Sequence, residues 1–325
     1  MGIFDEQIAR KPDNYSWSRE IISSMHNGFW TDKEFTFTSD KQDFLVTLTS
    51  QEREIIVKTL SAIAQIEIAV KKFWARLGDN LPHPSLVDLG LVLASVEVIH
   101  NLAYQRLLDE LDLNNVFEEN LKIEVISGRV NYLQKYNHRF YKDSKKQYVY
   151  ALILFTLFVE NVSLFSQFYI ILWMERYRNV LKDTAQQVNY TKREEDIHAK
   201  TGIKLINTIR QEYPELFDQE LEDKILSEAQ EAFKAESKII DWIVGDWSDQ
   251  RISANVLKEY IKSRINDSLY EIGFKQIYEL DVNLVRDFEW MYEDSLGNNS
   301  TDFFFQRPTD YAKNCLLYTS PSPRD

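Results

Sequence analysis

Apolar residues recur along most of the chain at the three- and four-residue spacing of amphipathic helices. Residues 49–52, Thr-Ser-Gln-Glu, have the form of a capping box and predict the start of a long helix that stops before Gly78. Further helices are predicted over about 17–28, 85–111, 117–141, 145–182, 191–213, 219–244 and 254–272. Long helices joined by short connections predict an all-α bundle.

One apolar stretch is long enough to span a bilayer. It runs from Tyr148 to Met174 but carries Glu160, Asn161 and Gln167 near its middle. A charge at the bilayer centre costs roughly 2.5–3.5 kcal/mol on the insertion scale. We therefore interpret this stretch as a helix buried inside a soluble bundle, with Glu160 directed at a specific partner.

Composition and charge narrow the function classes. The chain has 325 residues, a formal net charge of −13 and no Lys/Arg-rich face, so nucleic-acid binding is not expected. The N-terminus lacks the apolar segment of a secretory signal, and we predict a cytoplasmic protein without membrane attachment. The single cysteine, Cys315, excludes an internal disulfide and a Cys-based metal site.

Candidate chemistry lies in two Glu-x-x-His pairs, Glu97 with His100 and Glu195 with His198. Positions i and i+3 share one face of a helix, so each pair can present a carboxylate and an imidazole to one point. A single pair of this kind is common on helices and would be weak evidence. Two pairs in one chain are much harder to obtain by chance.

A further glutamate precedes each pair on the preceding predicted helix. Glu67 points in the same direction as Ile56, Leu60, Ile63 and Trp74, and Glu160 lies in the apolar stretch. Burying carboxylates among apolar side chains is costly without a counter-charge. Two divalent cations would balance the four inward carboxylates, and this ligand set is that of the di-iron and di-manganese carboxylate bundles. Carboxylate with imidazole suits Fe or Mn better than a tetrahedral zinc site.

Tyr104 extends the candidate site. It follows Glu97 by seven residues and His100 by four, so its ring should lie on the same stripe, near the metals. The matching position of the second half is Gly202. The alternative interpretation of Tyr104 is core packing with a hydrogen-bonded hydroxyl.

These residues closely resemble the small subunit of class I ribonucleotide reductase over the chain up to Asn314. The resemblance implies a ferritin-like helical bundle with extra helices. Tyr104 matches the tyrosyl-radical position. The implied metal ligands are Glu67, Glu97, His100, Glu160, Glu195 and His198.

The resemblance also implies a radical path. Trp30, in Gly-Phe-Trp-Thr-Asp, matches the tryptophan near the metal site, and Tyr311 matches the relay tyrosine of the tail. The family path runs from a metal-bound His through an Asp to the Trp. This chain has Glu194 where Asp is usual.

Two residues bear on the metal. Glu67 stands where many members have Asp, and Lys71 follows it by one turn. The pair resembles the manganese-dependent subclass Id, in which a dimanganese centre is itself the oxidant. We therefore favour two Mn ions over a di-iron centre with a tyrosyl radical at Tyr104. The alternative interpretation of Glu67 and Lys71 is an ordinary i,i+4 ion pair, which would stabilise the helix by a few tenths of a kcal/mol.

The resemblance implies that the chain would be a ribonucleoside-diphosphate reductase small subunit, active only with the large subunit. It would supply the oxidant for deoxyribonucleotide biosynthesis and DNA replication, and it would form a homodimer. Two alternatives stay open: another di-metal carboxylate oxidase, such as a ligand-binding oxidase or desaturase, and a ferritin-like non-enzymatic metal protein.

The C-terminal region differs in character. We expect a metal-binding helical domain over 1–297 and the start of a mobile tail over 298–314. The last residues, 315–325, read CLLYTSPSPRD, and we interpret them as a non-native or disordered extension. Relatives continue into a segment that docks the large subunit, so we expect the chain as written to associate weakly.

Overall fold

The computed structural model describes residues 2–292, apart from the side chains of 67–69. Its helices are α1 (Ser18–Asn27), α2 (Thr38–Gln42), α3 (Ser50–Ala75), α4 (Leu77–Asn80), α5 (Pro84–Glu110), α6 (Asn114–Asn120), α7 (Glu124–Leu133), α8 (Ser144–Leu154), α9 (Phe165–Arg178), α10 (Lys182–Glu212), α11 (Gln219–Val244), α12 (Ala254–Glu271) and α13 (Val282–Phe288). Short π-helical segments are η1 (Asp43–Thr47) and η3 (Phe155–Glu160), and 3₁₀ turns are η2 (Gln134–Asn137) and η4 (Pro214–Leu216). Within this part of the chain the only β pairing is an isolated bridge, which confirms the all-α class.

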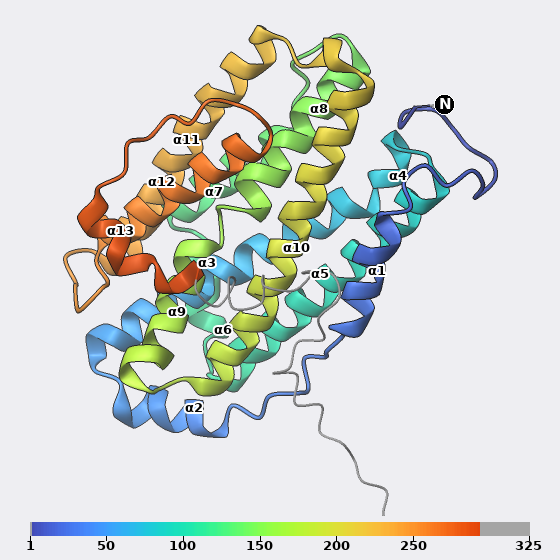
Figure 1. Ribbon diagram of the computed structural model, residues 1–325. Helices are drawn as coiled ribbons and strands as arrows, with labels where there is room; N and C mark the ends of the chain where they lie inside the picture. The colour runs from blue at the N-terminus through green and yellow to red at the C-terminus, as the bar shows by residue number, and fades with distance from the viewer. Residues whose placement is uncertain (1, 293–325) are drawn as a thin grey trace, which may run out of the picture.

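Four helical segments form the centre of the bundle. The helix α3 packs along α5, and α10 packs along α9 and η3 (Figure 1). Contacts of α3 with α9 and of α5 with α10 close the four into one bundle. The helices α7, α8, α11 and α12 flank it, and α1 covers α5. The segments that carry the two Glu-x-x-His pairs and the glutamates before them are therefore neighbours in space.

The predicted start of α3 is confirmed in detail. Thr49 Oγ1 accepts from the backbone N–H of Glu52 at 3.2 Å, and Glu52 Oε2 accepts from the backbone N–H of Thr49 at 2.9 Å. This is the reciprocal arrangement of a capping box.

The predicted helix over 145–182 is wrong as one continuous element. It is divided into α8, the π-helical η3 and α9, and Glu160 is the last residue of η3. The apolar run is continuous across the division, so periodicity gave no signal of it. π-Helical turns are frequent at functional sites, and this one ends at a predicted ligand. The prediction over 117–141 likewise divides into α6, α7 and η2.

The helix α10 begins nine residues earlier than the pattern predicts. Its N-cap residue, Leu181, provides no side-chain cap. Instead the buried carboxylate of Asp40 accepts from the backbone N–H groups of Asp183 and Thr184, at 3.2 and 2.7 Å. A cap supplied from α2, far away in sequence, cannot be recognised from local sequence signals.

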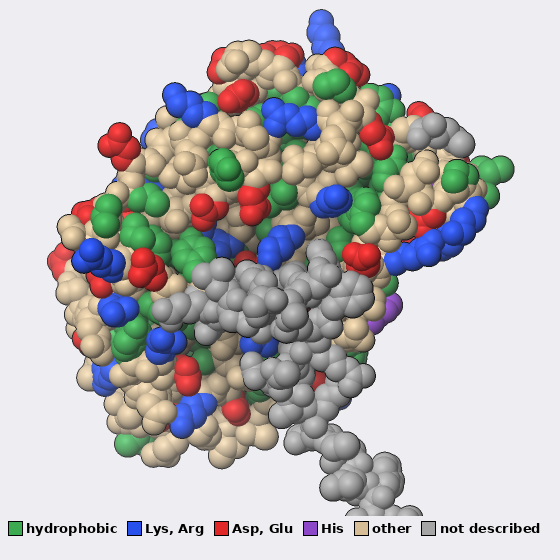
Figure 2. Space-filling model, viewed as in Figure 1, with side chains coloured by type: hydrophobic (Ala, Val, Ile, Leu, Met, Phe, Trp, Pro, Cys, Tyr) green, Lys and Arg blue, Asp and Glu red, His purple; other side chains and the backbone are tan. Residues whose placement is uncertain are grey.

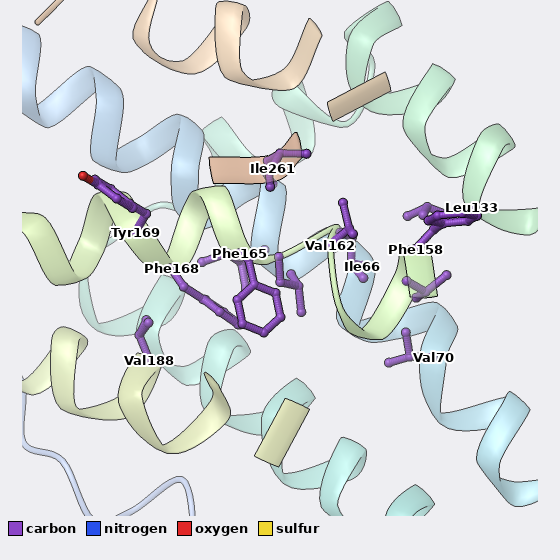
Figure 3. Packing of buried hydrophobic residues seen from close by; sticks show 14 of the residues in the cluster. Ile66, Val70, Leu133, Phe158, Val162, Phe165, Phe168, Tyr169, Val188 and Ile261 are labelled. Carbon is purple, nitrogen blue, oxygen red and sulfur yellow. The ribbon is translucent and has the colours of Figure 1, made fainter. Parts of the chain in front are cut away.

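The interior confirms the interpretation of the long apolar stretch. Two segments are long and apolar enough to cross a membrane, Pro84–Glu110 and Ser144–Arg178, and the apolar window of the second is entirely buried in the fold. Figure 3 shows Phe165 and Phe168 of α9 packed near Val162 and close to Ile66 of α3. The second segment is therefore a core element of the bundle. On the face shown in Figure 2, acidic and basic side chains are interspersed.

Candidate metal centre

The two Glu-x-x-His pairs lie on facing helices. Glu97 and His100 project from α5, Glu195 and His198 project from α10, and none is more than 1% exposed. Because the two members of each pair are three positions apart on a regular helix, both face the bundle interior. The structure thus brings together the two motifs that the sequence placed almost 100 residues apart.

Glu160 joins them from the end of η3. Its position is fixed by the turn that follows, where Arg264 of α12 donates to the carbonyl of Asn161 at 2.6 Å. The same guanidinium lies over the ring of Phe165, 3.2 Å from its centroid. Sequence analysis did not identify Arg264, because nothing local marks a residue that supports a distant turn.

The donor atoms converge tightly. His198 Nδ1 lies 2.8 Å from Glu97 Oε1 and 3.4 Å from Glu195 Oε2. His100 Nδ1 lies 3.1 Å from Glu195 Oε1 and 3.4 Å from Glu97 Oε2. One ligand atom from each of four side chains lies within 4.8 Å of all the others, and these are Glu97, Glu160, Glu195 and His198.

The donor set fits a metal cation. Both carboxylate oxygens of Glu97 and of Glu195, and both ring nitrogens of His198, are buried without a hydrogen bond of good geometry among the described residues. Buried polar groups in native proteins are normally satisfied, so such convergence of acceptors needs a cation. The side chain of the sixth predicted ligand, Glu67, lies outside the described residues.

The electrostatics of the site also fit a bound cation. Burial, together with the negative charge of Glu195, raises the pKa of Glu160 well above its ordinary range. Burial opposes the charge of Glu195 too, but the adjacent imidazoles of His100 and His198 outweigh burial and lower the pKa of Glu195. Burial also opposes the charge of His198, yet the carboxylates around it raise its pKa well above the ordinary value. A bound divalent cation would stabilise all the carboxylates in their charged form.

A hydrogen-bonded chain leads away from His100. Its Nε2 lies 2.7 Å from Glu194 Oε2, and Trp30 Nε1 donates to the same oxygen at 2.9 Å. All three side chains are buried. Glu194, although longer than the Asp usual in the family, therefore connects His100 to Trp30.

A second tryptophan, which sequence analysis did not place in the site, lies on the opposite side. Trp74 of α3 is fully buried and donates from Nε1 to Glu160 Oε1 at 2.7 Å. Its ring centroid is 5.8 Å from that of His198. The helical wheel placed Trp74 on the same side of α3 as Glu67, and that was the signal available.

Tyr104 and Gly202 occupy very different surroundings. Tyr104 is 1% exposed, and its hydroxyl donates to Thr191 Oγ1 at 3.3 Å. A Cβ at position 202 would lie only 2.1 Å from Thr156 Oγ1 of η3. The close approach of η3 to α10 therefore requires glycine, and an aromatic side chain has no room in the second half.

Two further predicted residues are not tested by the described part of the structure. Lys71 is partly exposed, and its amine donates to Asn101 Oδ1 of α5 at 3.4 Å. Any contact between Lys71 and Glu67 rests on a side chain that is not described. Tyr311 and the predicted segments 298–314 and 315–325 lie outside the described residues.

Comparisons with known proteins agree with this geometry. The sequence model of the family "Ribonucleotide reductase, small chain" matches residues 7–284. The ribonucleoside-diphosphate reductase subunit beta of Halalkalibacterium halodurans is 24% identical over 306 residues, which cover 92% of this chain and 87% of that protein.

Solved structures show the same fold. The R2 subunit of ribonucleotide reductase from Clostridium botulinum superposes with a TM-score of 0.72 at 20% identity, covering 87% of this chain and 89% of its own. An R2-like ligand-binding oxidase with a Mn/Fe cofactor superposes with a TM-score of 0.70 at 17% identity, covering 83% and 96%. The ferritin-like bundle implied by the family resemblance is thereby confirmed.

Proposed function

The chain belongs to the ribonucleotide reductase small-chain family, and from this premise we propose that it houses a dinuclear metal centre whose oxidising equivalent is passed to a large-subunit partner for ribonucleotide reduction. One observation carries the proposal: five predicted ligand side chains converge in a buried site, and Glu194 links that site to Trp30. The proposed ligands are Glu67, Glu97, His100, Glu160, Glu195 and His198.

Two Mn or Fe ions bound there would supply one-electron oxidising power that amino-acid side chains lack. Glu194 accepts at His100 Nε2, so the proton is held on Nε2 and the lone pair of Nδ1 faces the carboxylates. The same oxygen accepts from the indole N–H of Trp30. Glu194 can therefore take the indole proton when Trp30 gives up an electron, and the absence of exposed surface keeps water from competing.

Manganese is the metal that we propose. The support for manganese is the presence of Glu67 and Lys71 in the sequence. The Lys71 amine lies between α3 and α5, where it donates a hydrogen bond to Asn101. A cation beside a ligand carboxylate would help to admit an anionic oxidant such as superoxide. The alternative is a di-iron centre with a radical on Tyr104, which has in its favour a buried ring with a hydrogen-bonded hydroxyl.

We also propose a homodimer that is joined through α5. Leu91, Val98 and Leu102 follow one stripe of this helix and are 56%, 45% and 48% exposed. The apolar window of α5 is only half buried, although its hydropathy matches that of a membrane span. An exposed apolar stripe of this kind marks an interaction surface, and a second copy presents a matching one. Val98→Glu should yield a monomer in light scattering.

The large subunit is the second proposed partner. Tyr311 would relay the oxidising equivalent across that interface from the tail over 298–314. The function also predicts no binding to nucleic acid or membranes and a cytoplasmic location.

The test is reconstitution. The full chain is loaded with Mn(II) or Fe(II), activated, and mixed with the large subunit from the same organism, and deoxyribonucleotide formation is measured. The proposal predicts product only when both subunits are present, and none with Trp30→Phe at unchanged metal content. Oxidation of a small ligand without the large subunit would favour the ligand-binding oxidase instead, an alternative that the fold similarity keeps relevant.

A further inference from the structure

Trp74 begins a chain of aromatic rings that leads away from the metal centre. Its ring centroid lies 5.5 Å from that of Phe155 and 5.9 Å from that of Phe73. These two rings are stacked at 3.9 Å. Tyr136 of η2 then contacts both, at 5.4 Å from Phe155 and 5.5 Å from Phe73. No ring-to-ring step in this chain is longer than 5.9 Å.

The series of aromatic rings ends at a surface pocket. Tyr136 and Phe73 line a cavity of about 710 Å³ between the end of α3, η2 and the start of α8. This volume lies within the range of small-molecule sites. Buried Trp74 is thus connected to solvent through half-buried Phe73 and Tyr136.

The pocket is positively charged in an acidic protein. Lys72, Arg76, His138 and Arg139 line it, and no carboxylate of the described residues does. Among the described residues, no carboxylate lies within ion-pair distance of the three Lys and Arg side chains. The whole chain carries −13, so a local cationic cavity would attract small anions from solution.

We propose that the rings from Trp74 to Tyr136 form a second electron route, by which a small anionic one-electron reductant in this pocket reduces the oxidised metal centre. This inference rests on the proposed function, because that function supplies the oxidised centre. The route leaves the site at Glu160 and His198, whereas the proposed path to the large subunit leaves through His100 and Glu194.

The electron balance is simple. One electron leaves Tyr136 and reaches the centre through Trp74, so the centre is reduced by one electron and the phenol is oxidised by one. Tyr136 loses its phenolic proton to water in the pocket at that moment. The anionic donor then gives Tyr136 one electron, a proton returns from water, and the donor leaves oxidised by one electron.

The experiment measures how fast the oxidised centre of the full chain is reduced in the absence of the large subunit. Metal-loaded, activated protein is mixed with ascorbate, an anion, or with hydroxylamine, which is neutral above pH 7, and the decay of the oxidised-centre signal is followed by absorbance and EPR. Tyr136→Phe should slow reduction by both donors about tenfold or more, because the ring remains but the oxidisable phenol is lost. Tyr132→Phe, a half-buried tyrosine of α7 outside the chain of rings, is the matched control and should react at the wild-type rate.

A charge reversal tests the pocket. Arg76→Glu should slow reduction of the centre by ascorbate about tenfold and leave the rate with hydroxylamine unchanged, because the positive pocket attracts only the anion. Metal content and circular dichroism equal to wild type would establish that neither variant is misfolded.

The outcomes separate the two proposals. Equal reduction rates in wild type, Tyr136→Phe and Tyr132→Phe would overturn the route while leaving the proposed function standing. Slowing of both donors by Arg76→Glu would overturn the anionic selectivity of the pocket. Failure of the wild-type chain to form any oxidised centre would refute the proposed function, and the route with it.

Discussion

On the α5 side of the site, His100 is linked through Glu194 to Trp30, whereas on the α10 side Trp74 donates directly to Glu160 and faces His198. Both sides of the site therefore contain a glutamate and a histidine as proposed ligands, but the side chains around these ligands differ.

The difference has a physical basis. A tryptophan hydrogen-bonded to Glu194 exchanges a proton without disturbing the proposed ligands. A tryptophan hydrogen-bonded directly to Glu160 fixes that carboxylate and weakens its charge on one oxygen. Trp30 is thus suited to proton-coupled electron transfer toward the proposed partner subunit, whereas Trp74 orients Glu160 in addition to carrying the proposed electron from Tyr136. Four substitutions sharpen or break this comparison.

The largest effect is expected from Glu195, which lies between both histidines. Glu195→Ala should abolish stoichiometric metal binding and nucleotide reduction, because it removes a carboxylate that faces both His100 and His198. Elemental analysis of the purified variant checks this. Glu118→Gln, an exposed carboxylate of α6, is the matched control. Full metal occupancy in Glu195→Ala would exclude this residue as a ligand.

Glu194→Gln should lower nucleotide reduction by about 10–100-fold at unchanged metal content, since the amide can no longer accept the indole proton. Steady-state assays with the large subunit measure this. Glu194→Asp should be impaired as well, because the shorter side chain must still span His100 and Trp30. Wild-type activity in Glu194→Gln would remove this residue from the path.

Gly202→Ala should destabilise the fold by roughly 1–3 kcal/mol, because its Cβ would overlap Thr156. Urea denaturation gives the free energy of unfolding. The double variant Gly202→Ala with Thr156→Ala should recover part of the loss, and no recovery would show that the clash lies elsewhere.

The smallest effect is expected at the equivalent position of the first half. Tyr104→Phe removes one hydrogen bond of 3.3 Å to Thr191 and should cost about 1 kcal/mol of stability. If the centre is dimanganese and acts as the oxidant itself, this variant keeps its activity. Loss of activity together with a sharp radical signal would favour the di-iron alternative.

Much of the fold could be predicted because the responsible interactions are local. The helical periodicity, the Thr49 capping box and the two Glu-x-x-His pairs are each encoded within a few residues. The same locality explains how Glu97 and Glu195 could be assigned to inward faces.

The remaining features depend on contacts between distant segments. The π-helical turn that carries Glu160 lies in a uniformly apolar run, so no pattern marks it. The cap of α10 comes from Asp40 and the support of the Glu160 turn from Arg264, both far away in sequence. The hydrogen bond of Trp74 to Glu160 likewise required the packing of α3 on the rest of the bundle.

The dinuclear centre is tested most directly by metal analysis with low-temperature EPR, on full-length protein expressed with manganese and iron both available. We expect about two Mn per chain and a multiline mixed-valent signal after activation. Two iron ions with a sharp radical signal that Tyr104→Phe removes would contradict the choice of metal. Protein without stoichiometric metal would contradict the dinuclear centre itself.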